Sequence, residues 1–445
     1  MTETARHKVA VVGLGYVGSC VAGTLAEADW DVVGIDLNAR LVDDLADGVC
    51  RFEEHKIAEL IGRAVKSGRL RGTTNYAAVT GVDVVLITVG TPVRDDGSLA
   101  DEQLRSACTE LSRYLRRGQL VIVKSTVPPG ATRNLVLPLL ERSGLKAGAD
   151  FALAFTPERL AEGTALHELR SLPIVVGGVD EASVTAAAAF WSAALGVRVV
   201  PQDSLEAAEI VKLADNWWID LNIALANELA KLCALYGVDV LDVIDAANGI
   251  PKGAGNVNIL LPSAGVGGSC LTKDPWMVWQ AARSRGLQIL TAPAGRKVNE
   301  GMPRYTADTI LAELRSLGRK PADAAVAVLG MAFKNNTGDL RSTPVTAVVE
   351  ALRAAGVRVR VHDPLVDPEE ALKLLGFELS DTVHDAVRGA DCVAVLALHR
   401  EFTSVDYATL PVAKPCLVLD GRAYYPKEKI EFLRRLGYLY RGIGR

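Results

Sequence analysis

Short apolar runs alternate with longer segments of helical periodicity along the first third of the chain. The runs have the length of buried strands, and the segments between them repeat apolar residues every three or four positions. Strands that alternate with helices in this way favour a parallel, doubly wound α/β sheet with helices on both faces. The predicted strands are 8–12, 31–35, 82–89, 120–124 and 151–155, and the predicted helices include 19–28, 101–115 and 131–143.

The same alternation begins again in the last third of the chain. Strands are predicted at 324–329, 357–361, 393–397 and 417–419, with a helix at 343–355. Between the two α/β regions lies a helical pattern, 203–236, that contains neither proline nor glycine and is longer than most globular helices. We interpret it as a spine between two domains and as a dimer contact. Further helices are predicted at 274–285 and 291–317.

Length and composition agree with a large globular protein. The 445 residues suffice for two or three domains, and 49% hydrophobic with 23% charged residues is ordinary. The net charge of -4 gives no case for a nucleic-acid partner, and no apolar run is long enough to span a membrane. The seven cysteines lack a C-x-x-C spacing, which favours reduced thiols in the cytoplasm over disulfides or a metal site. The polar N-terminus leads directly into a strand, so no signal peptide is predicted.

A glycine fingerprint separates the first predicted strand from the first predicted helix. Glycines in this pattern permit a tight turn and let a pyrophosphate approach the helix N-terminus. Asp36 ends the second strand, where its carboxylate would accept hydrogen bonds from an adenine ribose and repel a 2′-phosphate. We therefore predict NAD rather than NADP as cofactor, although a glycine turn without a ligand would show the same letters. The predicted contacts in this turn are Gly13, Gly15, Tyr16, Val17 and Gly18.

Polar residues follow three further strands of the first domain. Open α/β sheets bind ligands outside the carboxyl ends of their strands, which is where Thr91-Pro92 and Ser125-Thr126 fall. The segment 156–163 follows the strand 151–155 and contains Glu158 and Glu162. Two carboxylates at a strand end can position water or act as a base, whereas a solvated loop with a helix cap is the alternative.

The central segment places a thiol, an amine and a carboxylate behind a glycine-rich run, 265–274. Glycine lets the backbone adopt positive φ and lets a ligand approach closely. Cys270 is thus a candidate nucleophile, because a nearby cation such as Lys273 raises the thiolate fraction. The alternative is that Cys270 is a small buried hydrophobe. Upstream, Lys212 and Asn216 lie four residues apart on one helix face, a spacing that more often marks a surface polar pair.

The second α/β domain has no glycine fingerprint, but it has polar residues at its strand ends. Phe333 and Lys334 follow the strand 324–329, and Arg422 follows the strand 417–419. An aromatic ring at this edge could stack on a base, and the cations could bind phosphates.

In their order along almost the whole chain, these motifs resemble the UDP-glucose/GDP-mannose 6-dehydrogenase family. The resemblance rests on the following pieces: Gly13 to Gly18, Thr91-Pro92, Ser125 to Pro128, Pro157-Glu158 with Glu162, Lys212 with Asn216, Gly267 to Cys270 with Lys273-Asp274, Ala332 to Lys334, Thr337 to Asp339 with Arg341, and Asp420 to Arg422. It implies two Rossmann-type doubly wound domains joined by a long helix. The NAD-binding domain would be 1–202, the central helical dimerisation region with the cysteine loop 203–300, and the UDP-sugar-binding domain 301–445.

The resemblance also implies a reaction, a four-electron oxidation of a sugar C6 alcohol to a carboxylate with two NAD. Cys270 would attack the intermediate aldehyde, and the resulting thiohemiacetal would be oxidised to a thioester that water hydrolyses. Lys212, Asn216 and Asp274 match residues that stabilise an oxyanion and handle protons, and Thr126 and Glu158 match residues that arrange water. The cofactor contacts so implied are Thr91, Pro92, Thr126, Glu162, Lys273 and Arg341. The substrate contacts so implied are Glu158, Arg159, Leu160, Lys212, Asn216, Asn256, Gly267, Phe333, Lys334 and Arg422.

Two departures bear on the sugar. Members of the family often have an arginine about fourteen residues before the nucleophile, where this chain has Asn256 with Lys252 nearby. The segment 157–160 is more similar to members that oxidise N-acetylhexosamines, and the Gly-Gly-Ser-Cys piece to those that oxidise UDP-glucose. UDP-glucose is the predicted substrate and a UDP-N-acetylhexosamine, such as the ManNAc or GlcNAc form, the alternative. A two-electron dehydrogenase with a structural Cys270, or a silent NAD-binding protein, are rival functions.

Overall fold

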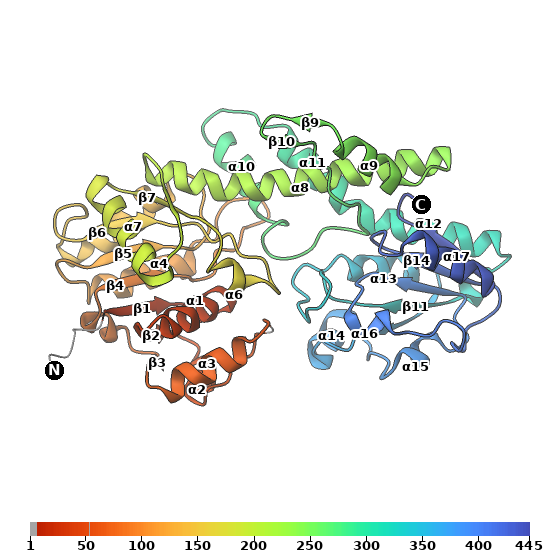
Figure 1. Ribbon diagram of the computed structural model, residues 1–445, viewed down its shortest axis with the longest axis horizontal. Helices are drawn as coiled ribbons and strands as arrows, with labels where there is room; N and C mark the ends of the chain where they lie inside the picture. Colours follow the sequence, from red (N-terminus) through yellow and green to blue (C-terminus); the bar gives the residue numbers. More distant parts are fainter. Residues whose placement is uncertain (1–6, 53) are drawn as a thin grey trace. The chain divides into compact units, whose positions relative to one another are not determined.

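The structure is a computed structural model that describes residues 7–52 and 54–445, and it comprises two compact units. Unit 1 extends to Asp215 and includes Gln280–Leu287, and unit 2 contains Asn216–Trp279 and Gln288–Arg445. The expected mixed α/β fold with largely parallel sheets and a long helix is confirmed (Figure 1). The division into three domains stays a prediction.

Unit 1 is built on an eight-stranded sheet with the order β3-β2-β1-β4-β5-β6-β7-β8. All neighbouring strands are parallel except β6 and β7, which are antiparallel. The strand order reverses at β1, which lies between β2 and β4, and such a switch point is where open α/β sheets bind ligands. The strands are β1 (Lys8–Val12), β2 (Asp31–Ile35), β3 (Leu70–Thr73), β4 (Val84–Ile87), β5 (Leu120–Val123), β6 (Ala152–Phe155), β7 (Ile174–Gly178) and β8 (Val199–Pro201).

Helices cover both faces of this sheet, because its central strands are apolar on both sides. One face packs against α1 (Tyr16–Glu27), α2 (Ala39–Ala46), α3 (Ile57–Lys66), α6 (Ala165–Glu168) and α7 (Glu181–Leu195). The other face packs against η1 (Tyr76–Gly81), α4 (Glu102–Ser112), η2 (Thr132–Val136), α5 (Leu137–Leu140) and the start of α8. A further short turn, η3 (Glu141–Ser143), follows α5.

Three predicted helices differ from the observed ones. Helix α1 begins at Tyr16, three residues before the predicted start at Ser19. The segment 131–143 is not one α-helix but a π-helical turn, then α5 and η3, and Pro138 at the start of α5 lacks an amide hydrogen. The segment 291–317 divides at Gly301, and Pro303 stands in the first turn of the second helix, where a missing N–H costs nothing.

Unit 2 combines a helical region with a five-stranded parallel sheet of order β12-β11-β13-β14-β15. The helical region contains most of α8 (Leu205–Tyr236), α9 (Val240–Asn248), the hairpin β9 (Pro251–Lys252) and β10 (Gly255–Asn256), and α11 (Thr291–Glu300). Helices α8 and α10 (Asp274–Arg283) begin in one unit and end in the other. Among the described helices, none has both the length and the apolar character that crossing a membrane requires.

Both faces of the second sheet are also buried. One packs against α12 (Met302–Ser316), α13 (Val345–Ala354) and α14 (Pro368–Leu375), and the other against α15 (Val383–Val387), α16 (Arg400–Thr403) and α17 (Lys427–Arg435). Because its strands are all parallel, their carboxyl ends share one edge, from which the loops with Phe333 and Arg422 extend. The strands are β11 (Ala325–Leu329), β12 (Arg358–His362), β13 (Cys392–Val395), β14 (Cys416–Asp420) and β15 (Tyr438–Gly442), and η4 (Pro321–Asp323) precedes β11.

Candidate active site

The glycine fingerprint forms the turn between β1 and α1, and its geometry explains two of the glycines. Gly13 has a φ of 98°, which disfavours any side chain. A Cβ on Gly18 would lie 1.8 Å from the Gly13 carbonyl oxygen, so only glycine allows the helix to pack this closely on the turn. Around Gly15 the space is open, since a Cβ there would meet no described atom within 4 Å.

The same turn fits a dinucleotide. Among the described residues, no side chain caps the N-terminus of α1, so its first amide groups are available to a pyrophosphate. Asp36 ends β2 beside the turn, and its carboxylate accepts hydrogen bonds from the amides of Leu14 (2.7 Å) and Asn38 (2.9 Å). These bonds fix the carboxylate at the position where a ribose is bound in such folds.

Thr91, Pro92 and Thr126 follow the carboxyl ends of β4 and β5. Both strands are parallel to β1 and lie next to one another, so these residues share the edge of the sheet with the glycine turn. Thr91 is buried, whereas Thr126 is half-buried and Pro92 is exposed. The structure thus gathers these three cofactor candidates with Gly13 and Asp36.

Glu158 lies in a buried polar cluster that the sequence did not predict in full. One carboxylate oxygen accepts hydrogen bonds from the amides of Arg159 (2.7 Å) and Leu160 (2.9 Å). The other lies 3.0 Å from the ammonium group of Lys124, which is 3% exposed and also stacks over Trp191. Lys124 ends an apolar run directly before Ser125, a signal that could have marked it as a site residue.

Arg159 and Leu160 have partners within unit 1. The Arg159 guanidinium forms an ion pair with Asp215 at 2.9 Å, and Leu160 packs against the hydrophobic core. Glu162 is half-buried in the same segment. Their predicted roles toward substrate and cofactor stay predictions.

Glu54 connects this segment to the glycine turn. Its carboxylate accepts hydrogen bonds from the Tyr16 hydroxyl (2.5 Å) and from the Gly163 amide (2.7 Å). Burial, followed by the bond to Glu54, raises the pKa of Tyr16 far above its ordinary value, so the phenol stays protonated. The link joins the fingerprint helix to the loop of Glu158, and no periodicity along the chain indicates it.

Glu209 connects the loop of Thr126 to helix α8. Its fully buried carboxylate accepts hydrogen bonds from the amides of Gly130 (2.5 Å) and Thr132 (2.9 Å). Lys212, one turn later on α8, is also buried, with 6% of its surface exposed. The interpretation of Lys212 as a surface residue is therefore wrong. Glu209 holds this part of α8 against the loop that contains Thr126.

Acid titration should detect Glu209. Burial raises the pKa of its carboxyl to about 6 from 4.5, against the opposing effect of its hydrogen bonds. The folded state thus binds this proton more tightly, so the stability it contributes is present below pH 4.5 and is lost as the pH rises through 6. Glu209→Gln should remove this loss, which amounts to about 2 kcal/mol, from the free energy of unfolding measured in urea between pH 4.5 and 7.5.

Glu206 provides the matched control on the same helix. Its hydrogen bond with Arg133 lowers its pKa, so its contribution to stability is lost as the pH falls. Because this loss begins only below pH 4.5, Glu206→Gln should leave the profile between pH 4.5 and 7.5 nearly unchanged and should alter it at lower pH, in the opposite direction. Parallel pH profiles for wild type and Glu209→Gln would contradict the assignment of a raised pKa to Glu209.

In unit 2, the candidate catalytic residues surround the start of helix α10. The carboxylate of Asp274 is fully buried, and its two oxygens are bound by the Asn216 amide and by the Lys273 ammonium, each at 2.5 Å. The spacing of Lys212 and Asn216 is more common for surface pairs, but Asn216 is buried, with only 6% of its surface exposed. Asp274 is thus held in one orientation by a group from α8 and a group from the turn before α10.

Cys270 lies one turn before α10 and is exposed. Its carbonyl oxygen accepts the amide hydrogen of Asp274 at 2.9 Å, which fixes the backbone of the turn without involving the thiol. The interpretation of Cys270 as a small buried hydrophobe is therefore wrong. None of the seven cysteines, all of which the structure describes, forms a disulfide.

The glycine-rich run before Cys270 packs against the loop that follows β11. A Cβ on Gly267 would lie 2.6 Å from the Cβ of Phe333, and one on Gly268 would lie 2.8 Å from its ring. The Gly268 amide also donates to the Arg341 carbonyl at 3.1 Å. Because only glycine fits under Phe333, the run seats the thiol turn on the second sheet of the same unit.

The remaining candidates of unit 2 lie at two places. Arg422 donates a hydrogen bond to the Phe333 carbonyl at 2.6 Å, which brings these two together with the half-buried Lys334. Arg341 is on the same loop and pairs with Asp339. Asn256 lies instead on the exposed hairpin of β9 and β10, where it pairs with Pro251.

The fold and these residues define a class, a dehydrogenase with a dinucleotide-binding domain and a second α/β domain. Sequence models of three domains of the UDP-glucose/GDP-mannose dehydrogenase family match the chain: the NAD binding domain at residues 7–194, the central domain at 206–301 and the UDP binding domain at 327–427. The chain belongs to this family and is an NAD-dependent nucleotide-sugar 6-dehydrogenase.

Individual relatives cover nearly the whole chain. A UDP-N-acetyl-D-mannosamine dehydrogenase from Pyrococcus horikoshii is 34% identical over 98% of this chain and 99% of its own length. A UDP-glucose 6-dehydrogenase from Haloferax volcanii is 33% identical over 93% and 96%. The solved UDP-glucose dehydrogenase from Pyrobaculum islandicum has a TM-score of 0.88 and 32% identity, covering 100% of this chain and 99% of that one.

Proposed function

We propose that the protein oxidises the C6 alcohol of a UDP-sugar to a carboxylate in two successive oxidations, with Cys270 as the covalent nucleophile. One observation supports the proposal above all: an exposed thiol on a glycine-seated turn, directly before a buried carboxylate that Asn216 and Lys273 hold in place. A thiol needed only for packing would be buried.

The proposed reaction comprises two oxidations at C6 and one hydrolysis. The alcohol loses a proton and a hydride to give an aldehyde, and the thiolate of Cys270 adds to C6, forming a C–S bond. The resulting thiohemiacetal again has a hydrogen on C6, so it loses its hydroxyl proton and a second hydride and becomes a thioester. Water then attacks the thioester carbonyl, the C–S bond breaks, and the carboxylate and the thiol are released. Bound NAD accepts one hydride in each oxidation, two per sugar.

The charged residues would act on oxygen and on protons. We assign the stabilisation of the negative oxygen at C6 to Lys212 and Asn216. A buried ammonium group and an oriented amide interact strongly with a negative charge where little water screens them. Asp274 would orient Asn216 and exchange protons with water. Thr126 and Glu158 would position the attacking water, with Glu158 kept in orientation by Lys124 and two amides.

NAD would be held in unit 1 by the turn of Gly13 to Gly18, with Asp36, Thr91, Pro92 and Glu162. Lys273 and Arg341 stay predicted cofactor contacts. In unit 2 Phe333, Lys334 and Arg422 would bind the uridine diphosphate, with Gly267 beside the sugar. Arg159, Leu160 and Asn256 are proposed as residues that affect the choice of sugar.

UDP-glucose is the first candidate substrate and would be converted to UDP-glucuronate. The Gly-Gly-Ser-Cys turn and the Thr337-Gly338-Asp339 piece support it, as does the likeness to two UDP-glucose dehydrogenases. UDP-N-acetyl-D-mannosamine is the second candidate, favoured by the 34% identical relative and by the segment 157–160.

A substrate panel tests the proposal. Purified protein with NAD should form two NADH per UDP-glucose consumed, and kcat/KM should rank UDP-glucose above UDP-N-acetyl-D-mannosamine. The reverse ranking would select the second candidate, and one NADH per sugar would contradict the two-step oxidation. Asn256→Arg restores the arginine frequent in the family, and an unchanged ranking in this variant would exclude Asn256 from the choice of sugar.

We also propose that the protein works in the cytoplasm with its thiols reduced.

In addition, we propose that two copies of the chain associate through helix α8. Trp218, Leu225 and Leu232 are each about half exposed and follow one another at intervals of seven residues, which places them on one helix face. The opposite face of α8 already packs in the core of unit 2. Sedimentation of the wild type as a dimer and of Leu225→Glu as a monomer is the expected result, and a monomeric wild type would contradict it.

A further inference from the structure

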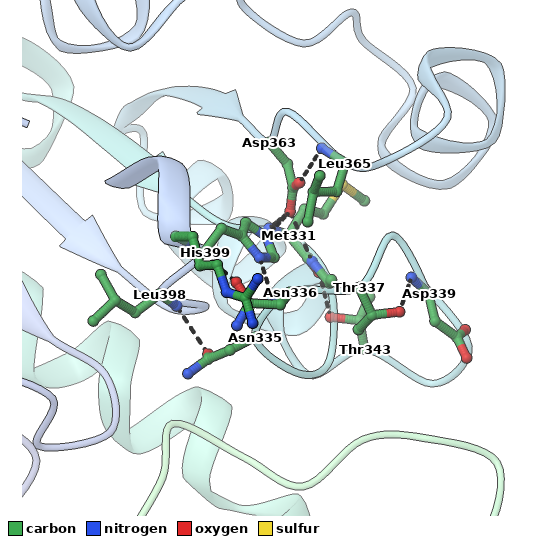
Figure 2. A network of polar contacts seen from close by, with 12 residues as sticks. Met331, Asn335, Asn336, Thr337, Asp339, Thr343, Asp363, Leu365, Leu398 and His399 are labelled. Carbon is green, nitrogen blue, oxygen red and sulfur yellow. Dashed lines mark hydrogen bonds and ion pairs between the residues drawn. The ribbon is translucent and has the colours of Figure 1, made fainter. Parts of the chain in front are cut away.

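The loop that joins β11 to α13 contains the residues proposed to bind the nucleotide. This loop, residues 330–341 and called here the nucleotide loop, contains Phe333, Lys334 and Arg341. It has no helix or strand of its own, so its shape depends on single hydrogen bonds, one of them within the loop from the Phe333 amide to the Asp339 carbonyl (3.1 Å) and others to side chains from elsewhere. Figure 2 shows that a network of polar contacts reaches it from two other strand ends.

Asp363, directly after β12, holds the beginning of the nucleotide loop. One of its carboxylate oxygens accepts hydrogen bonds from the amides of Met331 (2.6 Å) and Ala332 (3.1 Å), and the other from the amide of Leu365 (3.0 Å). Burial would raise the pKa of this carboxyl, but the bonds to His399 and to these amides outweigh it and lower the pKa. Asp363 is therefore a buried carboxylate anion.

His399, after β13, holds the middle of the same loop. Its Nδ1 accepts the amide hydrogen of Asn336 at 2.9 Å, and its Nε2 lies 2.9 Å from the carboxylate oxygen of Asp363 that binds Met331 and Ala332. An Nδ1 that accepts an N–H bears no proton, whereas an Nε2 against a carboxylate must donate one. His399 is thus a neutral imidazole protonated at Nε2, and its side chain is completely buried.

Two asparagine side chains complete the attachment. Asn335 Oδ1 accepts hydrogen bonds from the Leu398 amide and from the Tyr424 hydroxyl, and Asn336 Oδ1 accepts one from the Arg400 amide. Asn336 has a φ of 57°, a left-handed conformation that asparagine tolerates better than most residues. The middle of the loop is therefore held against the segment 398–400 in a conformation that it would not adopt by itself.

We propose that His399 is a positioning residue of the nucleotide site, holding the nucleotide loop in its binding conformation through the Asn336 amide while Asp363 fixes its tautomer. The inference rests on the proposed function, in which the loop binds the uridine diphosphate. The imidazole bridges the beginning and the middle of the loop, and Phe333 and Lys334 lie between these two attachment points. If the Asn336 bond is lost, the middle of the loop is held less firmly, whereas Phe333 keeps the hydrogen bond of its carbonyl to Arg422.

Three substitutions separate the two ends of the imidazole. Asparagine at 399 retains an acceptor near the position of Nδ1, glutamine retains a donor near the position of Nε2, and alanine retains neither. The measurement is the Kd for UDP by calorimetry, together with the Kd for NAD, which unit 1 binds and which reports that the protein is folded. The KM of the nucleotide sugar and kcat are measured on the same preparations.

The UDP affinities of the three variants should depend on whether residue 399 can still accept the amide hydrogen of Asn336. His399→Ala should weaken UDP binding about tenfold, the effect of one lost hydrogen bond to a buried group, and should raise the KM of the nucleotide sugar more than it lowers kcat. His399→Asn should bind UDP within about threefold of the wild type, because it can still accept from Asn336. His399→Gln should resemble His399→Ala. In all three the Kd for NAD should change less than the Kd for UDP, because the turn of Gly13 to Gly18 and Asp36 lie in unit 1 and only Arg341 of the proposed NAD contacts lies on the nucleotide loop.

Other outcomes are equally informative. Unchanged UDP binding in His399→Ala would overturn the positioning role, as would equal binding by His399→Asn and His399→Gln. Should His399→Ala fail to fold, the comparison of the asparagine and glutamine variants decides alone. A wild type that binds NAD but not UDP would instead refute the proposed nucleotide site, and the inference with it.

Discussion

Replacement of Cys270 by serine is expected to reduce steady-state NADH formation about 10³-fold or more, the scale observed when a covalent nucleophile is removed. A serine hydroxyl in the same exposed turn is far less ionised than a thiol, so it forms the adduct at C6 poorly. In this mechanism the second hydride is transferred from the adduct and not from the free aldehyde, so the reaction stops at the aldehyde. The measurement is NADH formed per UDP-sugar consumed, in wild type and variant.

Cys233→Ala is the matched control for this prediction. Cys233 is buried on α8 in the core of unit 2, where a slightly smaller apolar side chain changes little. This control should keep two NADH per sugar. Undiminished turnover by Cys270→Ser would return Cys270 to a structural role and leave a two-electron dehydrogenase as the function.

Arg296→Met is expected to lower the free energy of unfolding of unit 2 by about 3–5 kcal/mol, because removal of one partner leaves a buried charge unpaired. Arg296 is 2% exposed and forms an ion pair with Asp220 at 2.7 Å. The Asp220 carboxylate also accepts from Asn299, which in turn binds Asn227, and Asn227 accepts from the Ser263 amide. Ser263 begins the segment that leads into the thiol turn, so the same substitution should reduce kcat.

The loss of stability should depend on pH. Burial raises the pKa of Asp220, and Arg296 is the main group that lowers it, so the pKa rises further in the variant. A raised folded-state pKa means that the folded protein favours the proton, and the stability from this group is regained as the pH falls. Urea unfolding at pH 7.5 and pH 5, followed by tryptophan fluorescence, should therefore show a smaller deficit at pH 5.

The double variant Asp220→Asn with Arg296→Met is the control for the charge. It removes the unpaired carboxylate, so it should be more stable at pH 7.5 than Arg296→Met alone. A deficit that is the same at both pH values, and unchanged in the double variant, would show that Arg296 contributes through packing rather than charge.

Much of the fold could be predicted from local patterns. The strands 8–12 and 31–35 coincide with β1 and β2, because four apolar residues in succession fit only a buried strand at that length. The strands β3, β7 and β8 of the first sheet and β15 of the second were not predicted, nor was the hairpin of β9 and β10. The four sheet strands lie in the outer parts of their sheets, and short segments with Arg71, Gly177, Pro201 or Arg441 lack the apolar continuity of central strands.

The sequence by itself determined the class of protein, an NAD-dependent dehydrogenase of nucleotide sugars. A glycine fingerprint between a strand and a helix, an acid at the end of the next strand and a thiol behind a glycine run are each encoded within about thirty residues. Local spacing suffices for such motifs, since the chemistry of each follows from neighbours along the chain. The family resemblance, which the domain models confirm, rested on these motifs in their order.

Only the tertiary structure decided which side chains meet. Lys124 with Glu158, Asn216 with Asp274, and Asp363 with His399 are separated by 34, 58 and 36 positions, and no periodicity relates them. Each pair forms because packing buries both members, and a buried charge or amide must then find a partner. The burial of Lys212, the exposure of Cys270 and the neutral tautomer of His399 follow from the same packing, which the order of the residues does not reveal.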